Sequence, residues 1–105
     1  MKTSLKEEAI QVAARIREEL KPSAILLFGS VARGSETDGS DLDFCLLFDK
    51  MPGRKLDVMR MARSVSRPVH KGAMDIVAYS REEWEAYIAC GSSFELRLQR
   101  EAVSL

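Results

Sequence analysis

The chain has 105 residues, 46% of them hydrophobic and 30% charged, which is the composition of a water-soluble globular protein. Its length predicts a single domain over residues 1–105, with one modest core. Sixteen Lys and Arg residues balance sixteen Asp and Glu residues, so the net charge is zero. This balance argues against a protein that holds a long nucleic acid by bulk electrostatics, and it leaves little repulsion to oppose self-association into a homo-oligomer or docking to a partner.

The sequence pattern also bears on the compartment of the protein. The opening segment MKTSLKEEAI has acids where a signal peptide needs an apolar core, and no apolar run approaches the length of a membrane span. The two cysteines, Cys45 and Cys90, have no CxxC spacing, and Cys45 lies in an apolar run that predicts a buried thiol. We therefore expect a cytoplasmic protein with no membrane segment.

The chain begins with a predicted helix over 4–20. Ser4 and Glu7 have the spacing of a capping box, and the helix ends before Pro22 because a proline disfavours helical backbone in the residue that precedes it. Its apolar residues recur at helical spacing, namely Leu5, Ala9, Val12, Ile16 and Leu20.

Two strands follow this helix. The apolar run 24–28 is too short for a helix and predicts a buried strand. The run 42–48 predicts a second strand that is apolar on both faces and therefore central in a sheet. Between them we expect a short helical segment over 31–33, ended by Gly34, and a loop over 35–40.

The second half of the chain predicts a helix over 55–66, a third strand over 74–79 and two more helices, the first of which ends at Gly91. Two pairs have capping-box spacing and mark the starts of these helices, Ser80 with Glu83 and Ser92 with Glu95. Residues 102–105 form either a last short strand or a frayed end. This order predicts the α/β (α+β) class, with a small mixed β-sheet flanked by helices.

Three acids stand out against this framework. Asp41 and Asp43 are two apart at the start of the second strand, so they point to the same face while Leu42 points to the other. Two buried carboxylates side by side repel each other, and a divalent cation relieves the repulsion. Asp75, in the third strand, adds another carboxylate. Oxygen-only ligands favour Mg²⁺, or alternatively Mn²⁺, and three such acids can hold two ions about 4 Å apart for phosphoryl or nucleotidyl transfer.

A phosphate-binding turn is predicted at the end of the first strand. Gly29 allows the backbone to approach an anion closely. The Ser30 hydroxyl and the Arg33 guanidinium can then donate hydrogen bonds to phosphate oxygens. The small residues would hold a triphosphate, and the acids would hold the metal that neutralises it.

Each of these features has an ordinary interpretation when it is taken alone. A Gly-Ser turn is most often only a turn, a DxD pair is most often a surface motif, and Arg33 is most often a surface charge. The single histidine, His70, is interpreted as a loop residue, with nucleotide contact as the alternative. Trp84 and Tyr87 are interpreted as core or partner-facing residues, with base stacking as the alternative. The order of the motifs is much more restrictive than any one of them.

The pattern GSVARG followed by SDLDFCLL and a later strand Asp resembles the minimal nucleotidyltransferases (MNT proteins) of the DNA polymerase β-like superfamily. Proteins of that family have a GSxxRG turn, an SDxD strand and a third Asp on a later strand. The segment FELRLQREAVSL is similar to the end of such domains. The resemblance covers most of the chain and implies the polymerase β-like nucleotidyltransferase fold.

The resemblance implies a role for each residue of the two motifs. Gly29 and Ser30 would hold the β- and γ-phosphates of a nucleoside triphosphate, and Arg33 and Gly34 would complete the turn. Ser40 would cap the turn that enters the second strand, which is a positioning role. These five residues are the predicted nucleotide-binding set.

The resemblance also implies the catalytic set and the reaction. Asp41 and Asp43 would ligate both Mg²⁺ ions, and Asp75 would complete the catalytic ion's ligand shell and help to deprotonate the attacking hydroxyl. The reaction would be attack on the α-phosphate, most often of ATP, with release of pyrophosphate.

Stand-alone MNT proteins are commonly paired with a HEPN-domain toxin, so the resemblance implies an antitoxin that adenylylates a tyrosine of its partner. Two alternatives remain at this point. One is an antitoxin that neutralises its partner by docking, with catalysis secondary or lost. The other is a small-molecule nucleotidyltransferase, of the antibiotic-modifying kind, that acts as a dimer.

Overall fold

The computed structural model describes residues 4–35 and 40–105. In chain order these residues form α1 (Leu5–Leu20), β1 (Ala24–Phe28), α2 (Gly29–Arg33), β2 (Leu42–Phe48), α3 (Lys55–Ser66), β3 (Met74–Ser80), α4 (Arg81–Ala89), α5 (Ser93–Glu101) and β4 (Val103–Ser104). Each helix and strand expected from the sequence is present, and α2 begins earlier than predicted, directly after β1. Most of the predicted loop over 35–40 lies outside the described residues.

The four strands make one mixed sheet in the order β3-β2-β1-β4. Strands β1 and β2 are antiparallel, β2 and β3 are parallel, and β4 is antiparallel to β1. The predicted central position of β2 is confirmed. Because β2 and β3 are parallel, they begin at the same end of the sheet, and β1 ends there.

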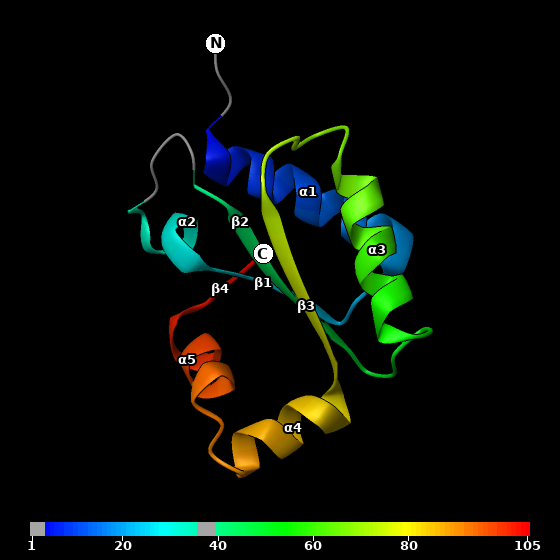
Figure 1. Ribbon diagram of the computed structural model, residues 1–105, viewed down its shortest axis with the longest axis vertical. Coiled ribbons are helices and arrows are strands. Elements are labelled where there is room, and N and C mark those ends of the chain that lie inside the picture. Colours follow the sequence, from blue (N-terminus) through cyan, green and yellow to red (C-terminus); the bar gives the residue numbers. More distant parts are fainter. Residues whose placement is uncertain (1–3, 36–39) are drawn as a thin grey trace.

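Helices cover both faces of the sheet (Figure 1). Helices α1 and α3 pack on one face, over a core that includes Ile16 from α1, Phe44 from β2 and Ala62 from α3. Helices α4 and α5 lie on the other face, where a smaller cluster joins Cys45 from β2 to Leu98 from α5. Phe44 and Cys45 are consecutive, so β2 is buried on both faces, as the sequence predicted.

The helix caps agree with the sequence at two of the three predicted positions. The Ser4 side chain accepts a hydrogen bond from the Glu7 backbone N–H at the start of α1. Ser80 and Glu83 form a complete capping box at the start of α4. The third prediction is wrong in its bonding, because Ser92 precedes α5 but its hydroxyl donates to the Glu95 carboxylate and caps no backbone N–H.

Two predictions about single side chains are refined by the fold. His70 does lie in the turn before β3, but its ring is buried and only 5% exposed. Trp84 packs partly buried against the smaller cluster, whereas Tyr87 is an exposed aromatic residue of α4. In the described part of the chain, no helix is both long and apolar enough to cross a membrane.

Candidate active site

The predicted acids meet at the end of the sheet where β1 ends and β2 and β3 begin. Asp43 pairs with Phe28 across the antiparallel ladder and with Asp75 across the parallel one. Partnered residues on neighbouring strands project to the same face, so the Asp43 and Asp75 side chains lie side by side. Asp41 directly precedes β2 and is close enough to act electrostatically on Asp43. The structure therefore places Asp43 and Asp75 side by side, with Asp41 close enough to act on Asp43.

The expectation that these acids are buried is only partly correct. Asp43 is half-buried, whereas Asp41 and Asp75 are exposed. Two features of the sheet explain the difference. Asp41 lies just before the first residue of β2, and β3 is an edge strand of the sheet. Both positions open toward solvent, although the residues that follow them on the two strands are buried.

Burial and the closeness of the other two acids make the ionised form of Asp43 unfavourable. Desolvation, the charges of Asp75 and Asp41, and a hydrogen bond with the Asp75 carboxyl together raise the pKa of Asp43 to about 6, against an ordinary value of 3.8. Arg33 acts in the opposite direction. A carboxyl that is unfavourable to ionise beside two others does not stabilise the fold. It is well suited to a place where a cation is to be bound.

The fit of a divalent cation to this site can be judged from the donors alone. Within residues 4–35 and 40–105, no three His, Cys, Asp or Glu side chains are grouped closely enough to hold one ion. The predicted ligands thus lie at the same end of the sheet, but they do not form a complete coordination site. The donor chemistry nonetheless fits Mg²⁺ or Mn²⁺, because all three donors are carboxylates and their mutual repulsion raises the pKa of Asp43.

Gly29 joins the turn to the acids more tightly than the sequence indicated. Its φ of +78° lies in the left-handed region, which favours glycine. In addition, a Cβ atom at this position would collide with Oδ2 of Asp43 and lie 3.0 Å from its Cγ. Glycine is therefore required here for backbone conformation and for the space that the Asp43 carboxyl fills.

The rest of the turn is held by its own backbone. Gly34, with φ +75°, ends α2 as predicted, and its N–H donates to the carbonyls of Ser30 and Val31. The N–H of Ser35 also donates to the Ser30 carbonyl, at 3.0 Å. Arg33 is exposed and its charge acts on Asp43. Ser40 is half-buried and immediately precedes Asp41.

Helix α5 supplies residues that sequence reasoning missed. A cavity of about 220 Å³ lies between the Gly29 turn and α5. It is lined by Gly29, Arg33, Asp43, Phe94, Arg97 and Glu101, among others. Phe94 is 43% exposed, and its ring meets that of Phe28 edge to face, with the centroids 5.9 Å apart. Arg97 thus joins Arg33 as a second guanidinium that lines this cavity.

The position of Arg97 depends on a buried polar contact under α5. The Tyr79 hydroxyl donates to Oε2 of Glu95 at 2.5 Å, and Ser92 donates to the other carboxylate oxygen. Burial tends to raise the pKa of Glu95, but these two hydrogen bonds outweigh it and hold the pKa below its usual range. With Leu98 buried in the smaller cluster, this contact fixes the face of α5 that carries Arg97. The sequence signal for it was the Ser92–Glu95 pair, which was interpreted as a capping box.

Comparison with known proteins agrees with the geometry. The model of a family described as nucleotidyltransferase domain matches residues 10–98. A candidate minimal nucleotidyltransferase of known structure is 25% identical, with a TM-score of 0.58, over 95% of this chain and 88% of that chain. A candidate nucleotidyltransferase from Sulfolobus solfataricus is 23% identical, with a TM-score of 0.56, over 99% of this chain and 89% of that one. The search of curated proteins gave no match.

Proposed function

Because the chain belongs to the nucleotidyltransferase domain family, we propose that it transfers a nucleoside monophosphate, AMP from ATP, to a hydroxyl of a partner protein. We further propose that this partner is a HEPN-type toxin and that the chain is its antitoxin. The observation that supports the transfer is the junction of the Gly29 turn with three acids at one end of the sheet. The partner is inferred from the resemblance to MNT proteins.

The turn and α5 would hold the nucleotide. Ser30 and Arg33 would donate hydrogen bonds to the β- and γ-phosphates, as the motif implies. Arg97, on the opposite wall of the cavity, offers a second guanidinium to the same anion. Phe94 is exposed at the same cavity and presents an apolar ring edge to whatever occupies it.

The acids would activate the acceptor. Asp41, Asp43 and Asp75 would hold Mg²⁺, which when bound neutralises the charge that develops on the phosphates. The acceptor oxygen forms a bond to the α-phosphorus, and the bond from that phosphorus to the bridging oxygen of pyrophosphate breaks. The hydroxyl proton passes to the Asp75 carboxylate, which is exposed and therefore accessible to an acceptor. Asp43 is half-buried and is held beside Asp75 by the register of β2 and β3.

The size of the cavity supports a macromolecular acceptor. About 220 Å³ beside Asp43 has room for only part of a nucleotide, and it leaves no enclosed space for a small-molecule acceptor next to that nucleotide. The side of Asp75 away from the cavity is open at an edge strand. A protein that brings its own surface to this edge fits better than an antibiotic.

The experiment that separates transfer from docking uses the double variant Ser30→Ala/Arg33→Ala, which weakens the grip on the triphosphate and leaves α1, α3 and α4 unchanged. Wild-type protein and the variant are co-expressed with the HEPN-type partner at matched levels, and the partner is analysed by mass spectrometry. We expect an added AMP mass with wild type only, together with loss of cell protection by the variant. Full protection by the variant, without nucleotide on the partner, would show a docking antitoxin instead.

A further inference from the structure

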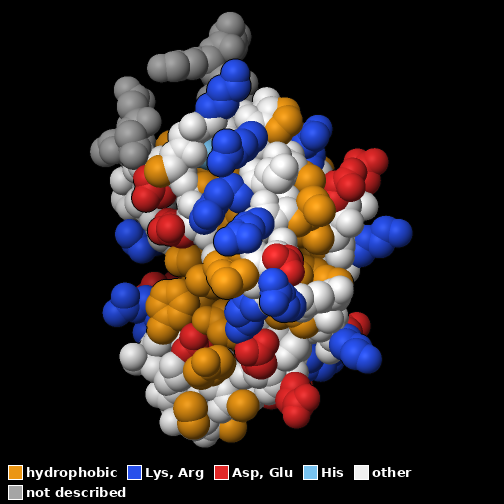
Figure 2. All heavy atoms as spheres, turned by 45° about the vertical axis from the view of Figure 1, so that its right-hand side comes forward, with side chains coloured by type: hydrophobic (Ala, Val, Ile, Leu, Met, Phe, Trp, Pro, Cys, Tyr) orange, Lys and Arg blue, Asp and Glu red, His pale blue; other side chains and the backbone are white. Residues whose placement is uncertain are grey.

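Basic side chains gather beside the acids on the α3 side of the sheet. A hollow of about 470 Å³ is lined by Arg63, Arg67, His70, Lys71, Gly72 and Met74. A second hollow of about 370 Å³ continues it along α3 and adds Arg60. Figure 2 shows Lys and Arg side chains in a column on the face that includes this side of the molecule. In a chain of zero net charge, this is a local excess of positive charge.

The charges of this basic hollow are not neutralised within the domain. Arg60, Arg63, Arg67 and Lys71 are exposed. Across residues 4–35 and 40–105, the ion pairs of Lys and Arg are Arg54–Asp57, Lys55–Glu83 and Arg81–Asp49, and none of them includes these four residues. One carboxylate does reach the lining, because Oε1 of Glu8 lies 3.5 Å from Nδ1 of His70. Four cations without a carboxylate partner, on the second half of α3 and the turn after it, leave this surface ready to receive an anionic group.

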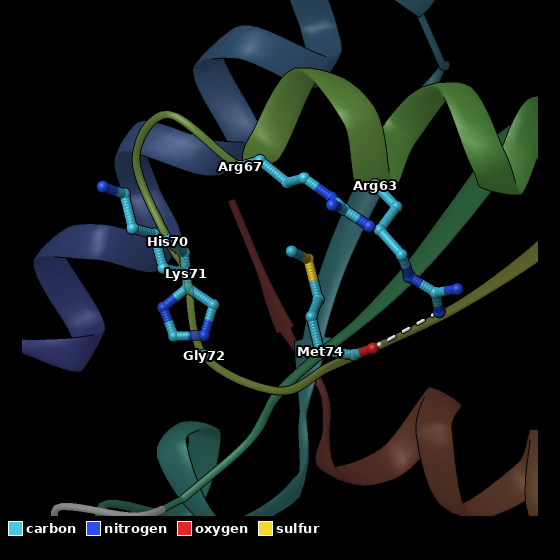
Figure 3. A pocket seen from close by; sticks show the side chains of 6 residues that line it. All are labelled: Arg63, Arg67, His70, Lys71, Gly72 and Met74. Atoms are coloured by element: carbon cyan, nitrogen blue, oxygen red, sulfur yellow. Dashed lines mark hydrogen bonds between the residues drawn. The ribbon is translucent and has the colours of Figure 1, made fainter.

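The basic hollow adjoins the candidate active site through β3. Met74 lines the hollow and directly precedes Asp75. Nη2 of Arg63 donates to the Met74 carbonyl oxygen at 3.4 Å (Figure 3). In the described chain β3 pairs only with β2, so this bond lies along the outer, otherwise unpaired edge of the sheet. The Met74 and Asp75 side chains point to opposite faces of the sheet, so a segment bound in the hollow would reach Asp75 by passing around the exposed edge of β3.

The turn that carries Lys71 is built around the buried His70 ring. Nε2 of His70 lies 3.2 Å from the Ala73 carbonyl oxygen, and a Cβ atom at Gly72 would come within 3.1 Å of that ring. The ring lies under the turn in Figure 3, with Lys71 directed away from it. The His70 ring thus holds the turn in place, and Lys71 and Arg67 both line the hollow.

We propose that the basic hollow binds an acidic segment of the protein acceptor and so places its hydroxyl at Asp75. This inference rests on the proposed function. An extended acidic segment can also pair with the free edge of β3, as peptides do when they add a strand to a sheet.

A nucleic acid fits this surface less well than an acidic protein segment. Among the described residues that line the two hollows, none is Phe, Tyr or Trp, so the stacking on which single-stranded nucleic acids rely is not offered. The basic residues are also confined to α3 and one turn. They do not form the long track that a polynucleotide backbone follows.

The test is a binding measurement that needs no catalysis. The probe is a fluorescent peptide with a central Tyr flanked on both sides by Asp and Glu, and its control replaces the acids by Asn and Gln. The protein variant is Arg67→Gln/Lys71→Gln, neither of whose side chains makes a hydrogen bond within the described residues. The matched control is Lys50→Gln/Arg100→Gln, which removes the same charge from exposed positions elsewhere. Fluorescence anisotropy at low salt gives each Kd, and a short single-stranded RNA is measured in parallel.

We expect the acidic peptide to bind wild type and the control variant equally, and the hollow variant about tenfold more weakly, the effect of two exposed ion pairs. The neutral peptide should bind none of them. Equal binding by the two variants, no binding of the acidic peptide, or preferential binding of RNA that is lost in the hollow variant would overturn the proposal. Failure of the proposed function is a separate result, namely absence of AMP on the partner although the peptide binds the hollow.

Discussion

The two faces of β2 have opposite effects on stability, as the consecutive residues Asp43 and Phe44 show. Phe44 is fully buried between α1 and α3 and is among the largest side chains of the main core. Asp43, its neighbour, faces the other side of the sheet, where desolvation and two further carboxyls make its ionised form costly. One face stabilises the fold through buried apolar side chains. The other face lowers the stability of the fold, because it holds repelling carboxylates that are useful only for binding. Such local conflicts are expected where a protein has a functional site.

The largest expected effect on stability is on the core face. Phe44→Ala removes a fully buried ring from the centre of the sheet and should lower the free energy of unfolding by about 3–5 kcal/mol. Chemical denaturation at neutral pH measures it. If the variant lost less than about 1 kcal/mol, the main core would not be packed around β2 as described.

A substitution at the turn tests whether the two sides of the site are in contact. In Gly29→Ala the new Cβ collides with the Asp43 carboxyl, and the alanine backbone must keep a φ of +78°. We expect a loss of about 1–3 kcal/mol of stability. Gly34→Ala is the matched control, since Gly34 has φ +75° but has no heavy atom within 4 Å of the added Cβ. A loss equal to that of the control would mean that Asp43 does not need the space at Gly29.

The fold was more predictable than the site, and particular residues show why. Apolar periodicity and capping pairs act over a few residues, so the bounds of β1, β2 and α3 followed from local sequence. The nearness of the three acids followed from motif order and from alternation along strands. Arg97 did not, because it reaches the cavity only after α5 docks through Leu98 and Glu95.

The solvent exposure of residues at the strand ends could not be predicted from the sequence either. Asp75 stands in an apolar run that predicts burial, yet it is exposed because it lies near the start of β3, which is an edge strand. Strand order decides this, and strand order is a tertiary property. The burial of His70 depends in the same way on the path of the turn that folds over its ring.

On the functional face, removing a charge should stabilise the fold. Because the pKa of Asp43 is raised to about 6 from 3.8, the native state binds the proton more tightly than the unfolded state, and stability falls as pH rises through this window. Asp43→Asn does not titrate. In metal-free buffer we therefore expect it to equal wild type near pH 4 and to exceed it above pH 7, by about 1 kcal/mol once solvent screening of a half-buried group is allowed for.

Denaturant titrations of both proteins across this pH range check the sign. The gap between them should narrow when Mg²⁺ is added at neutral pH, because a bound cation favours the ionised carboxylates of wild type. A gap that widened toward low pH would contradict the assigned cause of the shift.

The smallest expected effect concerns α5. Arg97→Ala should weaken nucleotide binding by about 1 kcal/mol, or roughly fivefold, because it removes one exposed cation from a cavity that retains Arg33. Arg100→Ala, on the same helix but outside that cavity, is the control. Titration of each variant with Mg-ATP, followed by the thermal midpoint, measures the difference. Identical midpoints for the two variants would remove Arg97 from the site.

The central claim is that the acids beside the Gly29 turn catalyse nucleotidyl transfer, and isotopic labelling tests it most directly. Purified protein, Mg²⁺ and the partner protein are incubated with ATP labelled at either the α- or the γ-phosphate. The account predicts that α-label becomes attached to the partner, that γ-label is released in pyrophosphate, and that Asp43→Asn forms neither product although it remains folded. Transfer of γ-label to the partner, or undiminished α-label transfer by Asp43→Asn, would contradict it.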